Sequence, residues 1–268
     1  MTACTLDCDE IRIDTPDGQL FATRWTPARS PVGRVPIVLF HESLGAVTLW
    51  RDLPANLARS TGRTVIAYDR LGFGRSDAHP GRLSLGFVTE EARTGFRALR
   101  AQLSIGDFIA YGHSTGGSIA AACAAEFPAQ CRALVMESAH VFVEPSTLDG
   151  IRATGARLIR PDKFARLTRH HGAKVFWVLD AWVNTWLDPA FANWNLDDAL
   201  DRIACPVLVV QGDNDPFASL AHAARVQALV KGPVAVSVMK HLSHVPHAEA
   251  PDLFLETMSD WLRANDIA

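Results

Sequence analysis

The sequence predicts an α/β fold in which helices cover both faces of a mostly parallel, eight-stranded sheet. Short apolar runs alternate with amphipathic stretches along most of the chain, which is the main observation behind this prediction. The length of 268 residues suits one large α/β domain. Hydrophobic residues make up 48% and charged residues 21% of the chain, as in globular proteins, so disordered and collagen-like chains are excluded.

Eight segments have strand character. The first two alternate polar and apolar residues on either side of Pro16-Asp17-Gly18, a sequence typical of a turn, and therefore predict a hairpin. Most of the others are continuous apolar runs, as expected of parallel strands buried on both faces. In chain order the predicted strands cover residues 10–14, 20–25, 36–40, 64–68, 107–111, 133–136, 206–210 and 234–238.

Helices are predicted between these strands, at residues 49–59, 85–103, 115–127 and 251–263. Such alternation implies right-handed crossovers and parallel strands. Residues 140–203 break it, because they contain no good strand run and are rich in Trp, Arg and His. The sequence therefore predicts a core formed by residues 1–139 and 204–268, with a helical cap inserted at 140–203.

Charge and cysteine content narrow the classes of partner. Twenty-six Lys and Arg stand against 29 Asp and Glu, a net charge of −3, so we expect neither nucleic acid nor a membrane as a partner. No leader or long apolar run is recognised, which favours a cytoplasmic location. The five cysteines are irregularly spaced and favour free thiols. Cys4 and Cys8 lack a second ligand pair nearby, so we expect no metal site.

Chemistry is first indicated where the strand at 107–111 meets the helix at 115–127. The residues between them form Gly112-His113-Ser114-Thr115-Gly116, a G-x-S-x-G pattern in strand–turn–helix context. This turn lifts the serine hydroxyl out of the sheet, and the two glycines avoid collisions with neighbouring backbone. The N–H of Thr115, at the start of the helix, is placed to bind a developing oxyanion. Ser114 is therefore the candidate nucleophile.

An acid and a base follow in the order that this architecture requires. A serine hydroxyl becomes nucleophilic when an imidazole takes its proton, and a carboxylate orients that imidazole. Asp213 and Asp215 follow the strand at 206–210, while His244 and His247 follow the last strand. Spacing from the preceding glycine favours Asp215 over Asp213. His247 comes directly after a proline, and we expect it to cap or pack against the last helix.

The order of these motifs resembles that of the α/β-hydrolase superfamily, among its serine-nucleophile members with a helical cap, over nearly the whole chain. The resemblance implies Ser114 as nucleophile, Asp215 as acid, His244 as base and no metal or organic cofactor. It also implies an oxyanion hole made by the backbone N–H groups of Thr115 and Ser43, with Glu42 as the less favoured alternative to Ser43. The matching motifs are the oxyanion loop at 41–45, the D-x-x-G-x-G-x-S turn at 69–76, the elbow around Ser114, the G-x-x-D turn at 212–215 and the H-x-P-H-x-E-x-P stretch at 244–251.

One residue departs from the family pattern. Most members have glycine after the oxyanion-loop histidine, whereas this chain has Glu42, whose side chain we expect at the pocket mouth. His41 itself is expected to orient the oxyanion loop through hydrogen bonds. His113 lies beside the nucleophile, and we treat it as a candidate substrate-binding residue whose role is open.

The predicted cap carries two further features. Trp182 and Trp186 lie one helical turn apart, which favours packing of the cap on the core; an apolar lining for an acyl or aromatic substrate is the alternative. Residues 151–174 hold seven basic residues and one acidic residue. Such a run is usually a solvated helix face, and the alternative is attraction of an anionic substrate.

Together these patterns favour a serine hydrolase that cleaves a carboxylic ester or thioester of a small-molecule acyl substrate. Two alternatives stay open: C–C bond hydrolysis of a vinylogous diketone, which the superfamily performs with the same triad, and a small-molecule receptor with little turnover. Epoxide hydrolysis and dehalogenation are disfavoured, because those relatives have an aspartate at the position of Ser114. The sequence does not indicate an oligomeric state.

Overall fold

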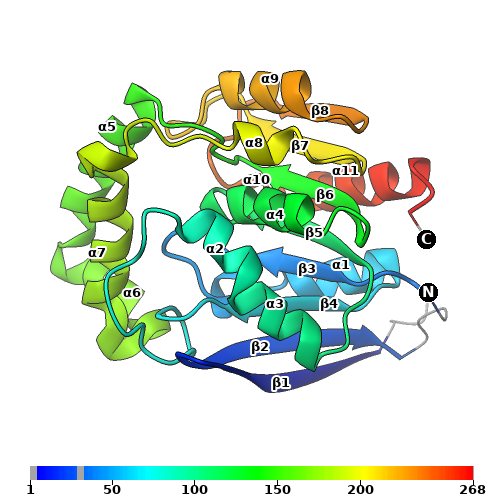
Figure 1. Ribbon diagram of the computed structural model, residues 1–268, viewed down its shortest axis with the longest axis horizontal. Coiled ribbons are helices and arrows are strands. Elements are labelled where there is room, and N and C mark those ends of the chain that lie inside the picture. The colour runs from blue at the N-terminus through cyan, green and yellow to red at the C-terminus, as the bar shows by residue number, and fades with distance from the viewer. Residues whose placement is uncertain (1–4, 29–32, 268) are drawn as a thin grey trace.

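The computed structural model describes residues 5–28 and 33–267 (Figure 1). Within these residues eight strands form one sheet in the order β1-β2-β4-β3-β5-β6-β7-β8. β2 pairs antiparallel with β1 and β4, and every other neighbouring pair is parallel. The predicted class and sheet are therefore confirmed. The strands are β1 (Leu6–Thr15), β2 (Gly18–Pro27), β3 (Ile37–Phe40), β4 (Val65–Asp69), β5 (Phe108–His113), β6 (Cys131–Glu137), β7 (Val207–Gly212) and β8 (Val234–Met239).

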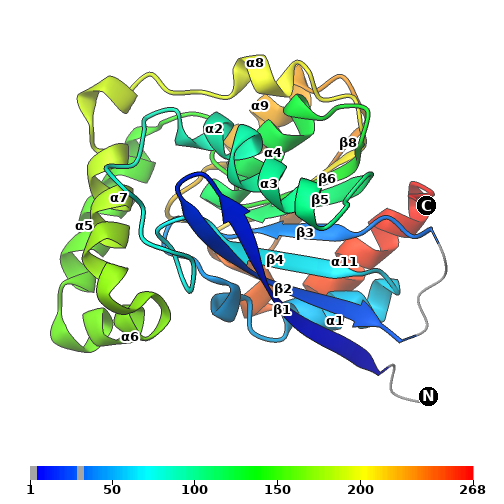
Figure 2. The same cartoon turned by 60° about the horizontal axis from the view of Figure 1, so that its bottom comes forward.

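Helices cover both faces of the sheet (Figure 2). α1 and α11 pack on one face, and α2, α3, α4, α8 and α9 pack on the other. The helices are α1 (Leu53–Thr61), α2 (Phe87–Arg93), α3 (Gly95–Gln102), α4 (Thr115–Glu126), α5 (Pro145–Leu158), α6 (Pro161–His171), α7 (Val175–Trp186), α8 (Asp197–Leu200), α9 (Leu220–Leu229), α10 (Pro246–Glu249) and α11 (Pro251–Ala264), with short 3₁₀ turns at Val47–Trp50, Gly172–Lys174 and Pro189–Phe191.

The central strands are the most deeply buried part of the sheet. Every residue of β3, β4, β5 and β7 is buried, whereas β8 at the edge is mostly half-exposed. A strand covered on both faces needs an apolar side chain at each position, which explains the continuous apolar runs. The loops that follow the carboxyl ends of these strands therefore begin at a closely packed part of the sheet.

The single helix predicted at 85–103 is wrong. The chain forms α2 and α3 instead, and leaves helical geometry at Thr94 (φ −113°, ψ −95°). Glu91 turns inward to accept a hydrogen bond from the Tyr68 hydroxyl at 2.8 Å. A Cβ at Gly95 would lie 2.2 Å from the Glu91 carboxylate, so the glycine leaves room for this side chain at the bend. Both short helices can then place their apolar residues on the sheet.

Two other helix predictions need correction. The helix expected at 49–59 starts later, because Arg51 has a φ of +52° and separates a 3₁₀ turn from α1. The segment at 220–229 forms α9, which the sequence analysis does not predict. The helix expected at 251–263 is present as α11.

Helices α5 to α8 lie between β6 and β7, in the stretch where the sequence predicts a cap. Figure 1 shows α5, α6 and α7 gathered at one end of the sheet. These three are called the cap helices below. The division of the chain into a core domain and a cap domain stays a prediction.

Two expectations from composition concern the whole chain. Cys8, Cys123, Cys131 and Cys205 are free thiols in the described part of the chain, and Cys4 lies outside it. Among the described residues, none of the helices is both long enough and apolar enough to cross a bilayer.

Candidate active site

Ser114 lies in a sharp turn between β5 and α4. Its φ of +55° is uncommon for a residue with a side chain and marks a strained backbone. The turn brings backbones into close contact: a Cβ at Gly112 would lie 2.0 Å from the Gly116 carbonyl oxygen, and one at Gly116 would lie 1.9 Å from that of Phe40. The G-x-S-x-G spacing is therefore a steric requirement of this turn.

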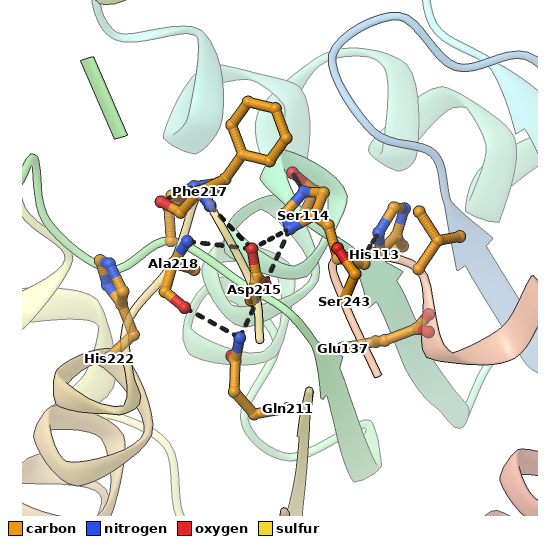
Figure 3. Close-up of polar contacts among 12 residues, drawn as sticks. His113, Ser114, Glu137, Gln211, Asp215, Phe217, Ala218, His222 and Ser243 are labelled. Atoms are coloured by element: carbon orange, nitrogen blue, oxygen red, sulfur yellow. Dashed lines mark hydrogen bonds and ion pairs between the residues drawn. The ribbon is translucent and has the colours of Figure 1, made fainter. Parts of the chain in front are cut away.

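Three side chains form a continuous chain of hydrogen bonds at this turn. Figure 3 labels Ser114 and Asp215, with the contacts of the Asp215 carboxylate drawn as dashed lines. Ser114 Oγ lies 2.9 Å from His244 Nε2, and His244 Nδ1 lies 2.8 Å from Asp215 Oδ2. Because Nδ1–H donates to the carboxylate, the Nε2 lone pair faces the serine hydroxyl. The structure thus brings together the three residues predicted as nucleophile, base and acid. Asp213, the alternative acid, accepts instead from the backbone N–H of His241 at 2.6 Å.

Asp215 is held as a carboxylate by several donors. It accepts hydrogen bonds from the N–H of Phe217 (2.8 Å) and Ala218 (3.2 Å) and from Gln211 Nε2 (2.7 Å). Burial alone would raise the pKa of Asp215, but the hydrogen bond and charge of His244, with these backbone N–H groups, hold it below its ordinary value. The Asp215 carboxylate is therefore ionised and fixed in orientation.

The loop after β3 approaches the same turn. Ser43 Oγ and Thr115 Oγ1 are 2.6 Å apart, which joins this loop to the first residue of α4. In the described part of the chain, the backbone N–H groups of Ser43 and Thr115 have no protein acceptor. Two donors from different loops are thus available beside Ser114. His41 stiffens the loop, since its Nδ1–H donates to the Glu42 carbonyl at 2.7 Å.

Glu42, the departure from the family pattern, folds back on its own loop. Its Oε2 accepts the N–H of Leu44 at 2.6 Å, and burial raises the pKa of its carboxyl. Glu42 and His113 both line a cavity of about 260 Å³ beside the loops that carry Ser43 and His244. Two of the four candidate substrate-binding residues therefore border one cavity.

His113 and His247 occupy structural positions. His113 is 4% exposed and donates from Nε2 to the His244 carbonyl at 2.8 Å. Burial lowers the pKa of His113 to about 3, so the ring is neutral. His247 does not cap α11, but it packs against that helix as predicted, with its ring centroid 6.1 Å from that of Phe254. Its ring also pairs with the buried Glu137 carboxylate at 2.7 Å.

Trp182 and Trp186 pack α7 against the core. They are 9% and 2% exposed, and the Trp186 ring lies 5.0 Å from that of His140. Phe176, one and a half turns before Trp182, is instead 72% exposed and lines a groove on the outer face of the cap helices. Among the described residues, the ring partners of Trp186 all lie within residues 140–203, but both Trp side chains belong to the main hydrophobic cluster on one face of the sheet, as cap–core packing requires. The strongly basic segment also faces solvent, with exposed cations at Arg152, Arg157, Arg160, Lys163, Arg166 and Arg169.

Several residues around the site were not predicted from the sequence. Glu137 at the end of β6, Gln211 near the end of β7 and His171 at the end of α6 all bond to the loops described above. A usable signal existed for Glu137 and Gln211, because a polar residue that ends an apolar strand lies at the sheet edge where sites form. No local pattern marks His171. Among the described residues, no cluster of three or more His, Cys, Asp or Glu could hold a metal ion.

A family model described as the alpha/beta hydrolase fold matches residues 35–174, more than half of the chain. The chain belongs to the α/β-hydrolase family. The matched segment contains Ser114, whereas Asp215 and His244 lie beyond it. Their assignment therefore depends on the geometry described above and on the motifs.

Curated relatives of this α/β hydrolase are hydrolases and acyl-transferring proteins. Serine hydrolase BPHL of Homo sapiens is 26% identical over 209 residues, which cover 75% of this chain and 69% of that protein. The (lyso)-N-acylphosphatidylethanolamine lipase of Bos taurus is 32% identical over 42% of this chain, and the match spans 33% of the lipase. The chain thus spans only about a third of the second relative.

Solved structures share the fold of this α/β hydrolase over nearly its full length. Proline iminopeptidase from Mycobacterium smegmatis superposes with a TM-score of 0.75 at 21% identity and covers 97% of this chain and 99% of its own. The 2-hydroxy-6-oxo-6-phenylhexa-2,4-dienoate hydrolase from Rhodococcus sp. strain RHA1 gives a TM-score of 0.77 at 17% identity, with coverage of 97% and 100%. At these identities the likeness establishes the fold alone.

Proposed function

We propose that this α/β hydrolase is a serine hydrolase that cleaves a carboxylic ester or thioester of a small-molecule acyl substrate. The observation that carries the proposal is the hydrogen-bond chain from Asp215 through His244 to Ser114. An imidazole bonded to a carboxylate on one nitrogen and to a serine hydroxyl on the other has the arrangement that activates serine. The relative named as a serine hydrolase supports the same class.

In the proposed reaction, Ser114 Oγ attacks the substrate carbonyl while its proton passes to His244 Nε2. Asp215 keeps the imidazole in the required tautomer and stabilises the imidazolium. His244 then gives the proton to the departing alcohol or thiol, which leaves an acyl group on Ser114. A water molecule, deprotonated by His244, attacks this acyl-enzyme and releases the carboxylic acid.

The negative charge on the carbonyl oxygen needs donors already in place. The backbone N–H groups of Thr115 and Ser43 are our candidates, since both come from loops that touch at Ser114. Thr115 also begins α4, so the positive end of the helix dipole faces the same point. Donors of this kind contribute about 3–4 kcal/mol to transition-state stabilisation.

Whether the site cleaves an ester or a C–C bond depends on which protein groups bind the carboxylate of the substrate. The C–C alternative needs a cap arginine or other polar group near the site. The cations of the cap helices are exposed to solvent, and Arg152 lines the groove on the outer face of these helices. This placement does not favour the C–C alternative. We therefore retain ester or thioester hydrolysis as the proposal.

The test is labelling with a fluorophosphonate probe, combined with steady-state assays on p-nitrophenyl esters of graded acyl length. We expect one adduct, mapped by mass spectrometry to Ser114, and measurable turnover. Ser114→Ala removes the attacking oxygen, so it should take no label and lose turnover by about 10⁶-fold.

Circular dichroism of Ser114→Ala should match that of the parent chain, which separates loss of chemistry from loss of fold. Turnover that survives this substitution would contradict the mechanism. Stoichiometric binding of a small molecule by a chain that neither labels nor turns over would favour the receptor alternative.

A further inference from the structure

A second buried acid–imidazole pair lies beside the Asp215–His244 pair. Glu137 ends β6 and is fully buried. Its Oε1 accepts the backbone N–H of His247 at 2.7 Å, and its Oε2 accepts His247 Nδ1–H at 2.7 Å and the Tyr111 hydroxyl at 2.6 Å. Both carboxylate oxygens are therefore bonded to protein groups.

The pair is a hydrogen-bonded acid–imidazole contact in a buried place. Burial alone would raise the pKa of Glu137, but the interactions with His247, with smaller contributions from His113 and Tyr111, lower it to about 2. Removing either partner leaves the buried polar groups of the other without that hydrogen bond, which is costly. The two residues thus hold each other in place.

The pair also touches two of the three loops that carry the proposed triad, those of Ser114 and His244. β5 and β6 are neighbouring strands in which His113 is the partner of Glu137, and the Ser114 N–H donates to the Glu137 carbonyl at 2.8 Å. His247 follows His244 by three residues, and His113 donates to the His244 carbonyl. Figure 3 shows Glu137 and His113 on one side of Ser114, with Phe217 and Gln211 on the other.

The loop that carries His244 is stiff within itself. The Glu249 carboxylate accepts the N–H groups of Ser243 at 2.7 Å and Val245 at 3.0 Å. Such bonds shape the loop but do not set its distance from the sheet. The bonds from Glu137 to His247 and from His113 to His244 are the ones that join this loop to β5 and β6.

We propose that Glu137 is a positioning residue, and that its hydrogen bonds to the ring and backbone of His247 hold the His244 loop against the Ser114 turn at the distance needed for proton transfer. The inference rests on the proposed function of that site. A displacement of about 1 Å in such a contact lowers a rate by about 100-fold, so the pair need not touch substrate to affect the chemistry.

The chain supplies a matched control. Glu144 and His222 form another Glu–His pair, with Nε2 and Oε1 3.0 Å apart and the His222 side chain 1% exposed. That pair joins the residue before α5 to α9 and bonds neither Ser114 nor His244. The Glu144 side chain is 14% exposed and also accepts the Ser219 N–H and hydroxyl at 2.8 and 2.9 Å, in the loop that carries Asp215. Glu144→Gln therefore weakens a less buried Glu–His contact that makes no hydrogen bond to the loops of Ser114 and His244.

The experiment measures the rate of fluorophosphonate labelling and the split between kcat and KM on the best ester. We expect Glu137→Gln and His247→Asn each to slow labelling and to lower kcat by about 100-fold, with KM within about threefold. The double variant should be no slower than either single variant, because each substitution removes the same interaction. When compared at an equal fraction of folded protein, Glu144→Gln should be labelled at a rate within about threefold of that of the parent chain.

Hydrogen exchange of residues 241–250 completes the test and needs no turnover. Exchange in this loop should rise in Glu137→Gln and stay unchanged in Glu144→Gln. An unchanged loop, or a loss of labelling no larger than in the control, overturns the inference. Failure of the parent chain to take label would count against the proposed function, while the exchange result still decides the positioning role.

Discussion

At the scale of single residues, two aspartates two positions apart serve different partners. Asp215 bonds to His244, whereas Asp213 accepts the N–H of His241 and lies 3.6 Å from Lys240 Nζ. Both carboxylates follow β7, so chain position alone does not separate them. The spacing of Asp215 from the preceding glycine favoured it as the acid. The structure agrees, because Asp215 bonds to His244 and Asp213 does not.

We predict that Asp215→Asn lowers kcat by about 10³ to 10⁴-fold, because an amide no longer holds the imidazole in the tautomer that accepts the serine proton. Asp213→Asn is the matched control and should change kcat by less than about threefold. Steady-state kinetics on one p-nitrophenyl ester measures both. The reverse ranking would move the role of the acid to Asp213.

Other residues at this scale could not be assigned from sequence. His113 and His247 each lie in or beside a motif, yet each bonds to a different backbone or carboxylate group. Glu137 and His247 are 110 positions apart in the chain. A histidine's role depends on which group faces its second nitrogen, and local sequence does not contain that information.

At the scale of elements, β5, the turn and α4 depend on the neighbouring strand. A Cβ at Gly116 would lie 1.9 Å from the Phe40 carbonyl oxygen, so the end of β3 limits what the turn accepts. The glycine pattern was readable from sequence because this steric rule holds wherever such a turn occurs. The break between α2 and α3 was not, since it depends on Tyr68 in β4.

We predict that Gly116→Ala lowers the free energy of unfolding by about 3 kcal/mol or more, because the backbone must shift to admit the methyl group. Gly106→Ala is the control: a Cβ there would meet no atom within 4 Å, and we expect a change below about 0.5 kcal/mol. Urea denaturation followed by fluorescence measures both. Equal midpoints for the two variants would contradict the steric argument.

At the scale of the whole molecule, His171 joins the cap helices to the loops of the sheet. It is 1% exposed, donates from Nε2 to the Leu44 carbonyl at 2.9 Å and accepts the Gly74 N–H at Nδ1, also at 2.9 Å. Burial lowers the pKa of His171 to about 4, so the ring is neutral and can do both. Because the folded-state pKa lies below the ordinary 6.5, this contribution to stability is present above pH 6.5 and is lost as pH falls through about 4.

We predict that His171→Ala lowers the free energy of unfolding by about 2 kcal/mol or more at pH 7, since it leaves a carbonyl and an N–H without partners. Hydrogen exchange should rise in α6 and α7 and stay constant in β5. The stability difference from the parent chain should shrink at pH 4.

The adjacent His170→Ala is the control for that prediction, because His170 bonds only an exposed threonine hydroxyl, Thr48, at 2.8 Å. Its exchange pattern should match that of the parent chain. If hydrogen exchange rose equally in all helices and strands of both His171→Ala and His170→Ala, His171 would not specifically hold the cap helices.

The α/β class, the strand positions and the triad candidates could be predicted from the amino-acid sequence, because these depend on local rules. Apolar runs mark buried strands, glycines mark the tight turn around Ser114, and motif order indicates Asp215 and His244. The folded chain was needed to find the pairing of Glu137 with His247, the anchoring of the cap helices by His171 and the packing of Trp186 on His140. These contacts join residues far apart in the chain. Strand order and the need of each buried polar group for a hydrogen-bond partner determine which residues meet. No local sequence pattern contains that information.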